Sequence, residues 1–143
     1  APYWDPNVRG ALFGLTRDTS DYDIVRATLE SVSFQCRDLM ECMTRDGAPL
    51  TRLRVDGGMV KNSWLIQNLA DVLQLKVDKP NNIETTALGA AYFAAIGANL
   101  VSGVDEVAEK WELDRQFSPS MHPKLADEMY LGWVNAVKRT LAR

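Results

Sequence analysis

Apolar side chains recur every three or four residues in the stretch that follows Ser20, and this spacing predicts one long amphipathic helix over residues 21–43. Ser20 is a favourable N-cap, and Asp21 and Asp23 suit the positive end of the helix dipole in the first turn. The predicted buried stripe consists of Val25, Leu29, Val32, Cys36, Leu39 or Met40, and Met43. We therefore expect this helix to pack on a sheet or on another helix.

Shorter apolar segments, bounded by Gly, Pro and polar residues, predict the other elements. The predicted strands are a short apolar segment at residues 10–15, residues 52–56, where Leu53 and Val55 alternate with arginines, and a segment with Leu75 and Val77 that ends at Pro80. The predicted helices are residues 62–73, with Leu65, Leu69, Val72 and Leu73 inward, residues 87–96, capped by 84–86, residues 104–111, and residues 124–142, with a stripe of Leu125, Met129, Trp133 and Val137. Residues 113–121 are expected to be irregular or extended.

The order from Leu53 onward is strand, helix, strand, helix, which is typical of parallel strands in an α/β sheet flanked by helices. Ligands of such open sheets bind outside the carboxyl ends of the strands. Gly57 and Gly58 stop the first of these strands at that edge, and Asn62 stands at the head of the following helix. A strand, a tight glycine turn and a helix N-terminus in this order suit the close approach of a nucleotide to the backbone.

Two further segments carry a packing expectation. Gly89, Ala90 and Ala91 give the predicted helix 87–96 little side chain on much of its surface. This composition favours close approach to a sheet, a helix or a ligand, and tight packing alone is the simpler interpretation. Near the N-terminus, Tyr3 and Trp4 are expected to anchor the first segment on the core.

The composition excludes several classes of protein. A formal net charge of −3, with the basic residues scattered along 143 residues, argues against a nucleic-acid-binding protein. No apolar run approaches the roughly 20 residues that a membrane span needs, and the N-terminus has no signal-peptide pattern. Cys36 and Cys42 fall in one predicted helix, about 120° apart around its axis, so reduced thiols in a cytoplasmic protein are expected.

Few residues have the pattern of a catalytic centre. His122, the one histidine, lies in a loop with prolines and is expected at the surface, and no Cys/His spacing suits zinc. Asp56 is interpreted as a turn or capping residue, and Lys61 either meets a phosphate or is solvated. Gly58 leaves room for an adenosine or its α-phosphate, whereas Asn62 suits both a helix N-cap and a purine edge. No catalytic or metal-ligating residue is therefore assigned.

Several separated segments carry a resemblance to a known family. Residues 10–15, followed after seven residues by residues 23–30, fit the second signature of the FGGY family of carbohydrate kinases. Residues 1–6, 54–58 and 84–92 resemble more narrowly the members of that family that phosphorylate glycerol. The resemblance covers nearly all of the chain, and the motifs occur in the family's order.

The resemblance implies an actin-like, ribonuclease-H-like ATPase fold with two lobes, of which residues 1–143 match the C-terminal portion of the second, nucleotide-side lobe. The implied reaction is transfer of the ATP γ-phosphate to the 3-hydroxyl of glycerol, with Mg²⁺. The glycine turn, at Gly57 and Gly58, and Asn62 are the implied nucleotide-binding residues. Many bacterial members have Ala-Val-Ala where this chain has Met59, Val60 and Lys61, a difference that alters the surface of the turn.

The resemblance also implies what lies elsewhere. The family's catalytic aspartate, glycerol pocket and main phosphate-binding loops belong upstream of Ala1, so the chain alone is expected to be inactive. The complete protein is expected to form a homo-oligomer and to bind neither nucleic acid nor membrane. Three alternatives stay open: another FGGY sugar kinase, a non-catalytic actin-like nucleotide-binding module, and a folding unit that binds no ATP.

Overall fold

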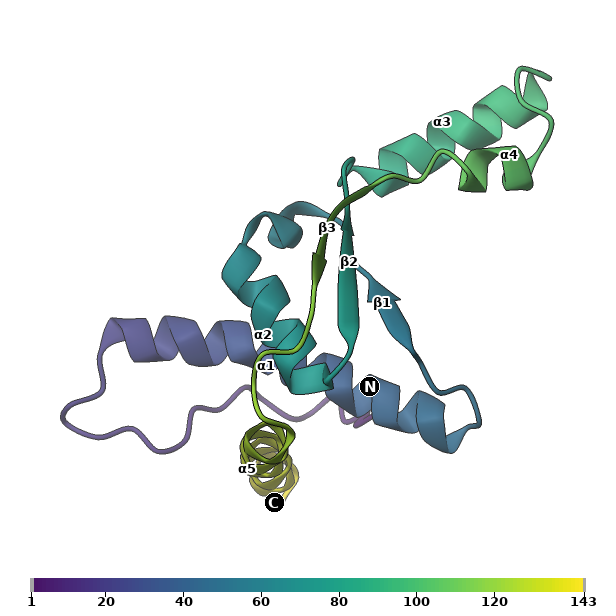
Figure 1. The fold of residues 1–143 in the computed structure, drawn as a ribbon. Coiled ribbons are helices and arrows are strands. Elements are labelled where there is room, and N and C mark those ends of the chain that lie inside the picture. Colours follow the sequence, from purple (N-terminus) through teal and green to yellow (C-terminus); the bar gives the residue numbers. More distant parts are fainter. Residues whose placement is uncertain (1, 143) are drawn as a thin grey trace.

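Three strands in the order β1-β2-β3 form the centre of the molecule (Figure 1). The computed structural model describes residues 2–142. Strands β1 (Arg52–Arg54) and β2 (Lys76–Pro80) are parallel, with Leu53 opposite Val77. Strand β3 (Leu113–Phe117) pairs with β2 in the antiparallel direction, with Phe117 opposite Val77. The parallel pair was predicted from the sequence, and β3 gives a defined partner to a segment expected only to be irregular or extended.

The helices agree closely with those expected. They are α1 (Asp21–Arg45), the 3₁₀ helix η1 (Gly58–Lys61), α2 (Ser63–Leu73), α3 (Thr85–Gly97), α4 (Val104–Ala108) and α5 (Pro123–Leu141). Ser20 forms the expected capping box of α1, because its side chain accepts from the Asp23 backbone while the Asp23 carboxylate accepts from the Ser20 backbone. Helix α4 ends three residues before the predicted boundary at Trp111.

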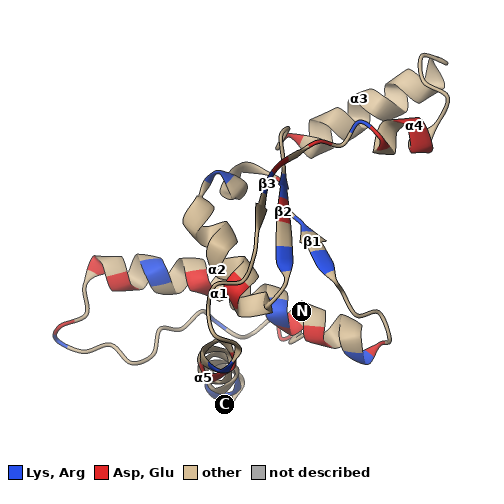
Figure 2. Cartoon of the chain, viewed as in Figure 1, with Lys and Arg blue, Asp and Glu red and all other residues tan. Residues whose placement is uncertain are grey.

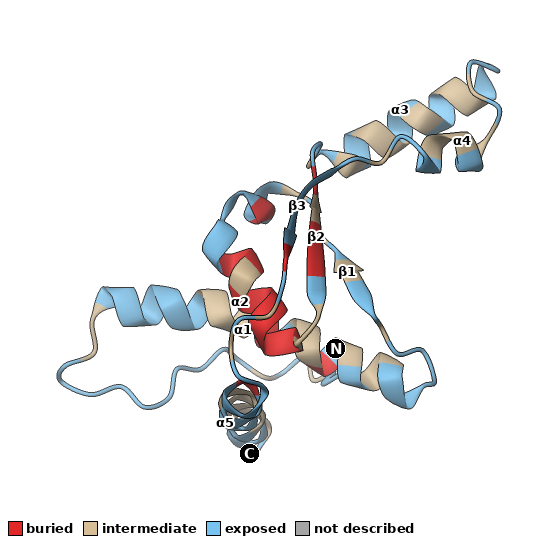
Figure 3. Ribbon diagram, viewed as in Figure 1, coloured by how far each residue is buried: buried red, intermediate tan, exposed pale blue. Residues whose placement is uncertain are grey.

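The core lies between α2 and the sheet, where Figure 3 shows most of the buried positions. Four apolar residues of α2 were predicted to face inward, and Leu65, Leu69, Val72 and Leu73 are all at most 8% exposed. The core cluster also takes in Val60 before α2, Val77 of β2 and Phe117 of β3. The amphipathic pattern of α2 therefore decides which face of the sheet is covered.

The buried face of α1 differs from the predicted stripe. Its buried residues are Ser33, Phe34 and Asp38, whereas Val25 and Leu39 are 59% and 49% exposed. The reason is that α1 packs on two neighbours. Its Cys36 and Met40 side chains contact the core beside α2, while the Phe34 ring stacks on Trp133 of α5 at a centroid distance of 5.8 Å.

The segment before α1 also differs from its prediction. Residues 10–15 are not a strand, and Leu12 and Leu15 are more than half exposed. No strand among the described residues pairs with them; instead the guanidinium of Arg139 in α5 lies 4.1 Å from the centre of the Phe13 ring. The predicted anchor at Trp4 is wrong, since this side chain is 86% exposed. The first segment therefore lies against α5 rather than in the sheet.

Helices α3 and α4 extend away from the ends of β2 and β3 (Figure 1). None of residues 85–97, all of which the structure describes, is buried, although α3 is rich in apolar residues. No residue of α3 is charged, and Figure 2 shows the helix beyond its N-cap Glu84 without blue or red. The expectation that its small residues pack tightly is wrong within residues 2–142, where Ala90 and Ala91 are exposed and a Cβ added at Gly89 would meet no atom within 4 Å.

Two general expectations concern the whole described chain. Both Cys36 and Cys42 are free, as expected; they are half-buried, and burial raises the pKa of the Cys36 thiol. Within residues 2–142, no helix has the length and apolar character that crossing a membrane requires.

Candidate functional site

The glycine turn after β1 joins the sheet to the start of α2. The Val55 amide donates to the Asp78 carbonyl at 3.1 Å, which keeps the chain beside β2 just beyond the end of β1. Gly57 then takes a φ of 85°, a left-handed value that favours glycine, and Gly58 begins η1. The buried side chain of Val60, 3% exposed, fixes η1 on the core. The side of the turn that faces the core is therefore fixed, while its outer side, away from the core, stays exposed.

Gly58 and Asn62 lie on this outer side. Gly58 is exposed, and a Cβ atom added there would meet no heavy atom of the described chain within 4 Å. Asn62 is exposed as well; its Oδ1 accepts from the backbone amides of Trp64 and Leu65 at 3.1 and 3.2 Å. The side chain is thus the N-cap of α2, one of the two roles predicted for it. Among the described residues, no atom accepts a hydrogen bond from its Nδ2.

The connection from β2 to α3 lies directly against the turn. The Gly57 amide donates to the Ile83 carbonyl at 2.9 Å, and the Thr85 hydroxyl donates to the Asp56 carboxylate. Asp56 therefore has the turn-stabilising role that was predicted for it. Its partner Thr85 was not found from the sequence, where residues 84–86 were interpreted only as a helix cap. Glu84 is at the N-cap position of α3 but makes no capping hydrogen bond through its side chain.

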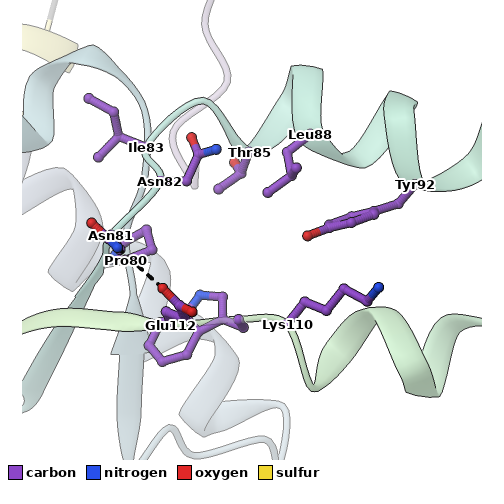
Figure 4. Close-up of a pocket in the computed structure, with 10 residues that line it drawn as sticks. Pro80, Asn81, Asn82, Ile83, Thr85, Leu88, Tyr92, Lys110 and Glu112 are labelled. Carbon is purple, nitrogen blue, oxygen red and sulfur yellow. Dashed lines mark hydrogen bonds between the residues drawn. The ribbon is translucent and has the colours of Figure 1, made fainter.

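A pocket of about 480 Å³ adjoins this connection, between the first turns of α3 and the segment that links α4 to β3 (Figure 4). Thr85, Leu88 and Tyr92 line it from α3. Lys110 and Glu112 line the opposite side, and the Asn81 side chain holds Glu112 by a hydrogen bond of 3.2 Å. No residue of the predicted nucleotide site lines this pocket, so it is a neighbour of the turn rather than part of it.

The other two residues considered from the sequence are His122 and Lys61. His122 is exposed and is the N-cap of α5, where its Nδ1 accepts from the Lys124 amide at 3.2 Å. Lys61 is exposed at the end of η1, a position open to solvent and to a ligand alike. Within residues 2–142, no three His, Cys, Asp or Glu side chains are placed to hold a metal ion. The candidate site as described is an exposed surface built on the turn.

Comparison with known proteins identifies the family. The model of the "FGGY family of carbohydrate kinases, C-terminal domain" matches residues 1–98. The chain belongs to the FGGY family of carbohydrate kinases. It is 53% identical to a glycerol kinase of Coxiella burnetii (strain Dugway 5J108-111) over 141 residues, which are 99% of this chain and 28% of that relative.

Solved FGGY kinases have the same fold. The structure is similar to that of Plasmodium falciparum glycerol kinase with ADP, with a TM-score of 0.84 and 34% identity over 100% of this chain and 29% of that one. It is also similar to xylulose kinase from Rhodospirillum rubrum, with a TM-score of 0.76 and 28% identity over 96% of this chain and 28% of that one. These similarities confirm the predicted fold, an α/β part of an actin-like, ribonuclease-H-like ATPase domain. The chain spans less than a third of the length of these relatives.

Proposed function

We propose that this chain is the C-terminal, nucleotide-side portion of a glycerol kinase, and that residues 1–143 belong to the second lobe of that enzyme. The observation that carries the proposal is the 53% identity to a glycerol kinase over 99% of the chain. The lower identity of 28% to a xylulose kinase of the same fold favours glycerol over a sugar as the phosphoryl acceptor. The complete enzyme transfers the γ-phosphate of ATP to glycerol and forms glycerol 3-phosphate.

Within this chain, the proposed role is to bind the adenosine side of ATP at Gly57, Gly58 and Asn62. Three features support this role: the exposed outer side of the turn, the open space above Gly58, and the amide nitrogen of Asn62 without a partner in the described chain. The structural relative with ADP supports a nucleotide as the ligand. Gly57 sets the backbone direction, Gly58 admits the ligand, and Asn62 offers an amide donor without giving up its capping bonds.

Mg²⁺ is the proposed metal cofactor, bound with the ATP phosphates. Magnesium sites in kinases generally use one or two carboxylates together with phosphate oxygens and water. Phosphoryl transfer needs such a metal, phosphate clamps and a positioned base in one site. Because the chain spans 28% of the length of its relative, we propose that these groups belong to the rest of the enzyme. The complete enzyme is further proposed to act as a homo-oligomer.

The test is glycerol-dependent formation of ADP by the complete polypeptide that contains this chain. We expect turnover with glycerol, little turnover with xylulose, loss of activity on chelation of Mg²⁺, and no turnover by the 143-residue chain alone. Light scattering of the purified enzyme checks the oligomer. A preference for xylulose over glycerol would contradict the proposed substrate, and glycerol-dependent ADP formation by the isolated chain would contradict the proposed division of the active site.

A further inference from the structure

The two residues at the beginning of the glycine turn are held by the β2–α3 connection. The Asp56 carboxylate accepts from the Thr85 hydroxyl, and the adjacent Gly57 amide donates to the Ile83 carbonyl at 2.9 Å. One bond is made by a side chain and the other by the backbone, and both cross to the same short segment. The conformation of that segment is itself defined, because the Glu84 amide donates to the Asn82 side chain at 2.9 Å.

These two hydrogen bonds hold the part of the turn that the fewest other contacts restrain. The Val55 amide is the last to pair with β2, and Val60 is the next residue fixed in the core. Gly57 and Gly58, between them, have no side chain that could pack. Gly57 lacks the Cβ that restricts rotation in other residues, so a neighbour must hold it at its positive φ.

We infer that Asp56 is a positioning residue for the nucleotide site, and that it places Gly58 and Asn62 by accepting the hydrogen bond of Thr85. This inference rests on the proposed nucleotide site. It means that Thr85, the first residue of α3, supports that site. Asp56 then acts through its acceptor oxygen rather than through its negative charge, and it contacts neither the nucleotide nor a metal. An uncharged acceptor at position 56 then holds Thr85 equally well. Removal of the Thr85 hydroxyl weakens ATP binding as much as removal of the Asp56 carboxylate.

The hydrogen bond from Thr85 to Asp56 also gives α3 a role in the nucleotide site. This helix is not buried among the described residues, and Figure 1 shows it leaving the sheet just beside the turn. Its first residue, Thr85, is the one that holds Asp56. The N-terminal end of α3 is therefore part of the support of the nucleotide turn.

The experiment uses the complete kinase polypeptide and compares Thr85→Val, Asp56→Ala and the double variant with the wild type. Thr85→Val keeps the shape of the side chain and removes the donor. We expect each single variant to raise KM for ATP by roughly threefold to tenfold, the effect of one lost hydrogen bond, with kcat and KM for glycerol within about twofold of wild type. The double variant is expected to match the single variants, because both remove the same bond.

Three further variants separate positioning from other roles. Thr85→Ser keeps the hydroxyl donor and Asp56→Asn keeps an acceptor oxygen, so the hydrogen bond can still form in both variants. We expect KM for ATP to be close to the wild-type value in each. Thr86→Val is the matched control, since Thr86 is exposed next to Thr85 and makes no hydrogen bond through its side chain within the described chain. Hydrogen exchange at the Gly57 amide supplies a readout without nucleotide, and faster exchange is expected in Thr85→Val but not in Thr86→Val.

The contrary outcomes are distinct. A wild-type KM for ATP in Thr85→Val would overturn the inference while leaving the proposed function intact. Loss of kcat in Asp56→Asn would overturn it in favour of a catalytic or metal-binding carboxylate. Failure of the wild-type enzyme to bind ATP in a direct titration would refute the proposed function, and the inference with it.

Discussion

The indole Nε1 of Trp133 in α5 donates a hydrogen bond of 2.8 Å to the carboxylate of Asp38 in α1, which is only 3% exposed. The hydroxyl of Tyr130, also in α5, donates to the other oxygen of this carboxylate at 2.7 Å. A buried carboxylate is stable only if its oxygens are satisfied, and here both partners come from the same helix. Asp38 therefore fixes the position of α5 against α1.

Replacement of this carboxylate is expected to destabilise the chain strongly. Asp38→Ala removes the acceptor of two donors and leaves a cavity, so the free energy of unfolding should fall by about 2–4 kcal/mol. Urea unfolding measures the change. The control Asp18→Ala alters an exposed loop and should stay within about 0.5 kcal/mol of wild type; equal losses in both variants would refute the role of Asp38.

The same cluster predicts a loss of stability at alkaline pH. Burial raises the pKa of the Tyr130 hydroxyl, and the hydrogen bond to Asp38 raises it further. The folded chain thus keeps this proton at pH values where the unfolded chain, with an ordinary tyrosine pKa of about 10, has lost it. The stabilisation is fully present below pH 10 and is lost as the pH rises above it.

Tyr130→Phe removes this titration. We expect the difference in unfolding free energy between wild type and Tyr130→Phe to shrink when the pH is raised from about 8 to about 11. Urea unfolding at a series of pH values measures it. Tyr22, whose side chain is 82% exposed, provides the control Tyr22→Phe, for which a constant difference is expected. A constant difference for Tyr130→Phe as well would count against the role of the Tyr130 hydroxyl.

The two glycines of the turn should respond differently to alanine. Gly57→Ala places a Cβ on a residue with a φ of 85° and is expected to reduce the free energy of unfolding by about 1–2 kcal/mol. Gly58→Ala meets no neighbouring atom and has no positive φ, so its effect should be within about 0.5 kcal/mol. Thermal or urea unfolding of the two variants tests the difference, and a larger loss in Gly58→Ala would contradict the geometry of the turn.

The two roles of Asn62 can be separated by two substitutions. Asn62→Ala loses the N-cap of α2 and should cost about 1 kcal/mol of stability as well as affinity for ATP. Asn62→Asp keeps the capping oxygen but loses the amide donor, so stability should be retained while the affinity of the complete enzyme for ATP falls. Calorimetric titration with ATP, beside urea unfolding, measures both properties. Retained ATP affinity in Asn62→Asp would show that the side chain only caps the helix.

Local signals in the sequence predicted the starts of two helices and the glycine turn. Ser20 and Asn62 both stand immediately before an amphipathic stretch, and both are N-caps in the structure. Gly57 lies three residues beyond the end of β1, and its positive φ belongs to the turn that follows the strand. These predictions succeeded because each depends on the backbone of a few neighbouring residues, which a sequence displays directly.

Features that depend on distant partners were missed. Asp38 is a charged residue in a helix, and only the donors of α5 explain its burial. Thr85 holds Asp56 across 29 positions of the chain, and its sequence context indicated no more than a helix cap. Residues 10–15 have the composition of a strand but no partner strand among the described residues, so composition alone gave the wrong element.

Binding of ATP to the complete enzyme with Gly58→Val is the most direct test of the nucleotide site. The open space above Gly58 is the place proposed for the nucleotide, and a valine side chain fills it. Gly10→Val, at another exposed glycine without neighbours within 4 Å, is the matched control. We expect calorimetric titration to show at least about tenfold weaker ATP binding in Gly58→Val, equivalent to about 1.4 kcal/mol, and wild-type binding in Gly10→Val. Wild-type affinity in a folded Gly58→Val enzyme would contradict the assignment of this turn to the nucleotide.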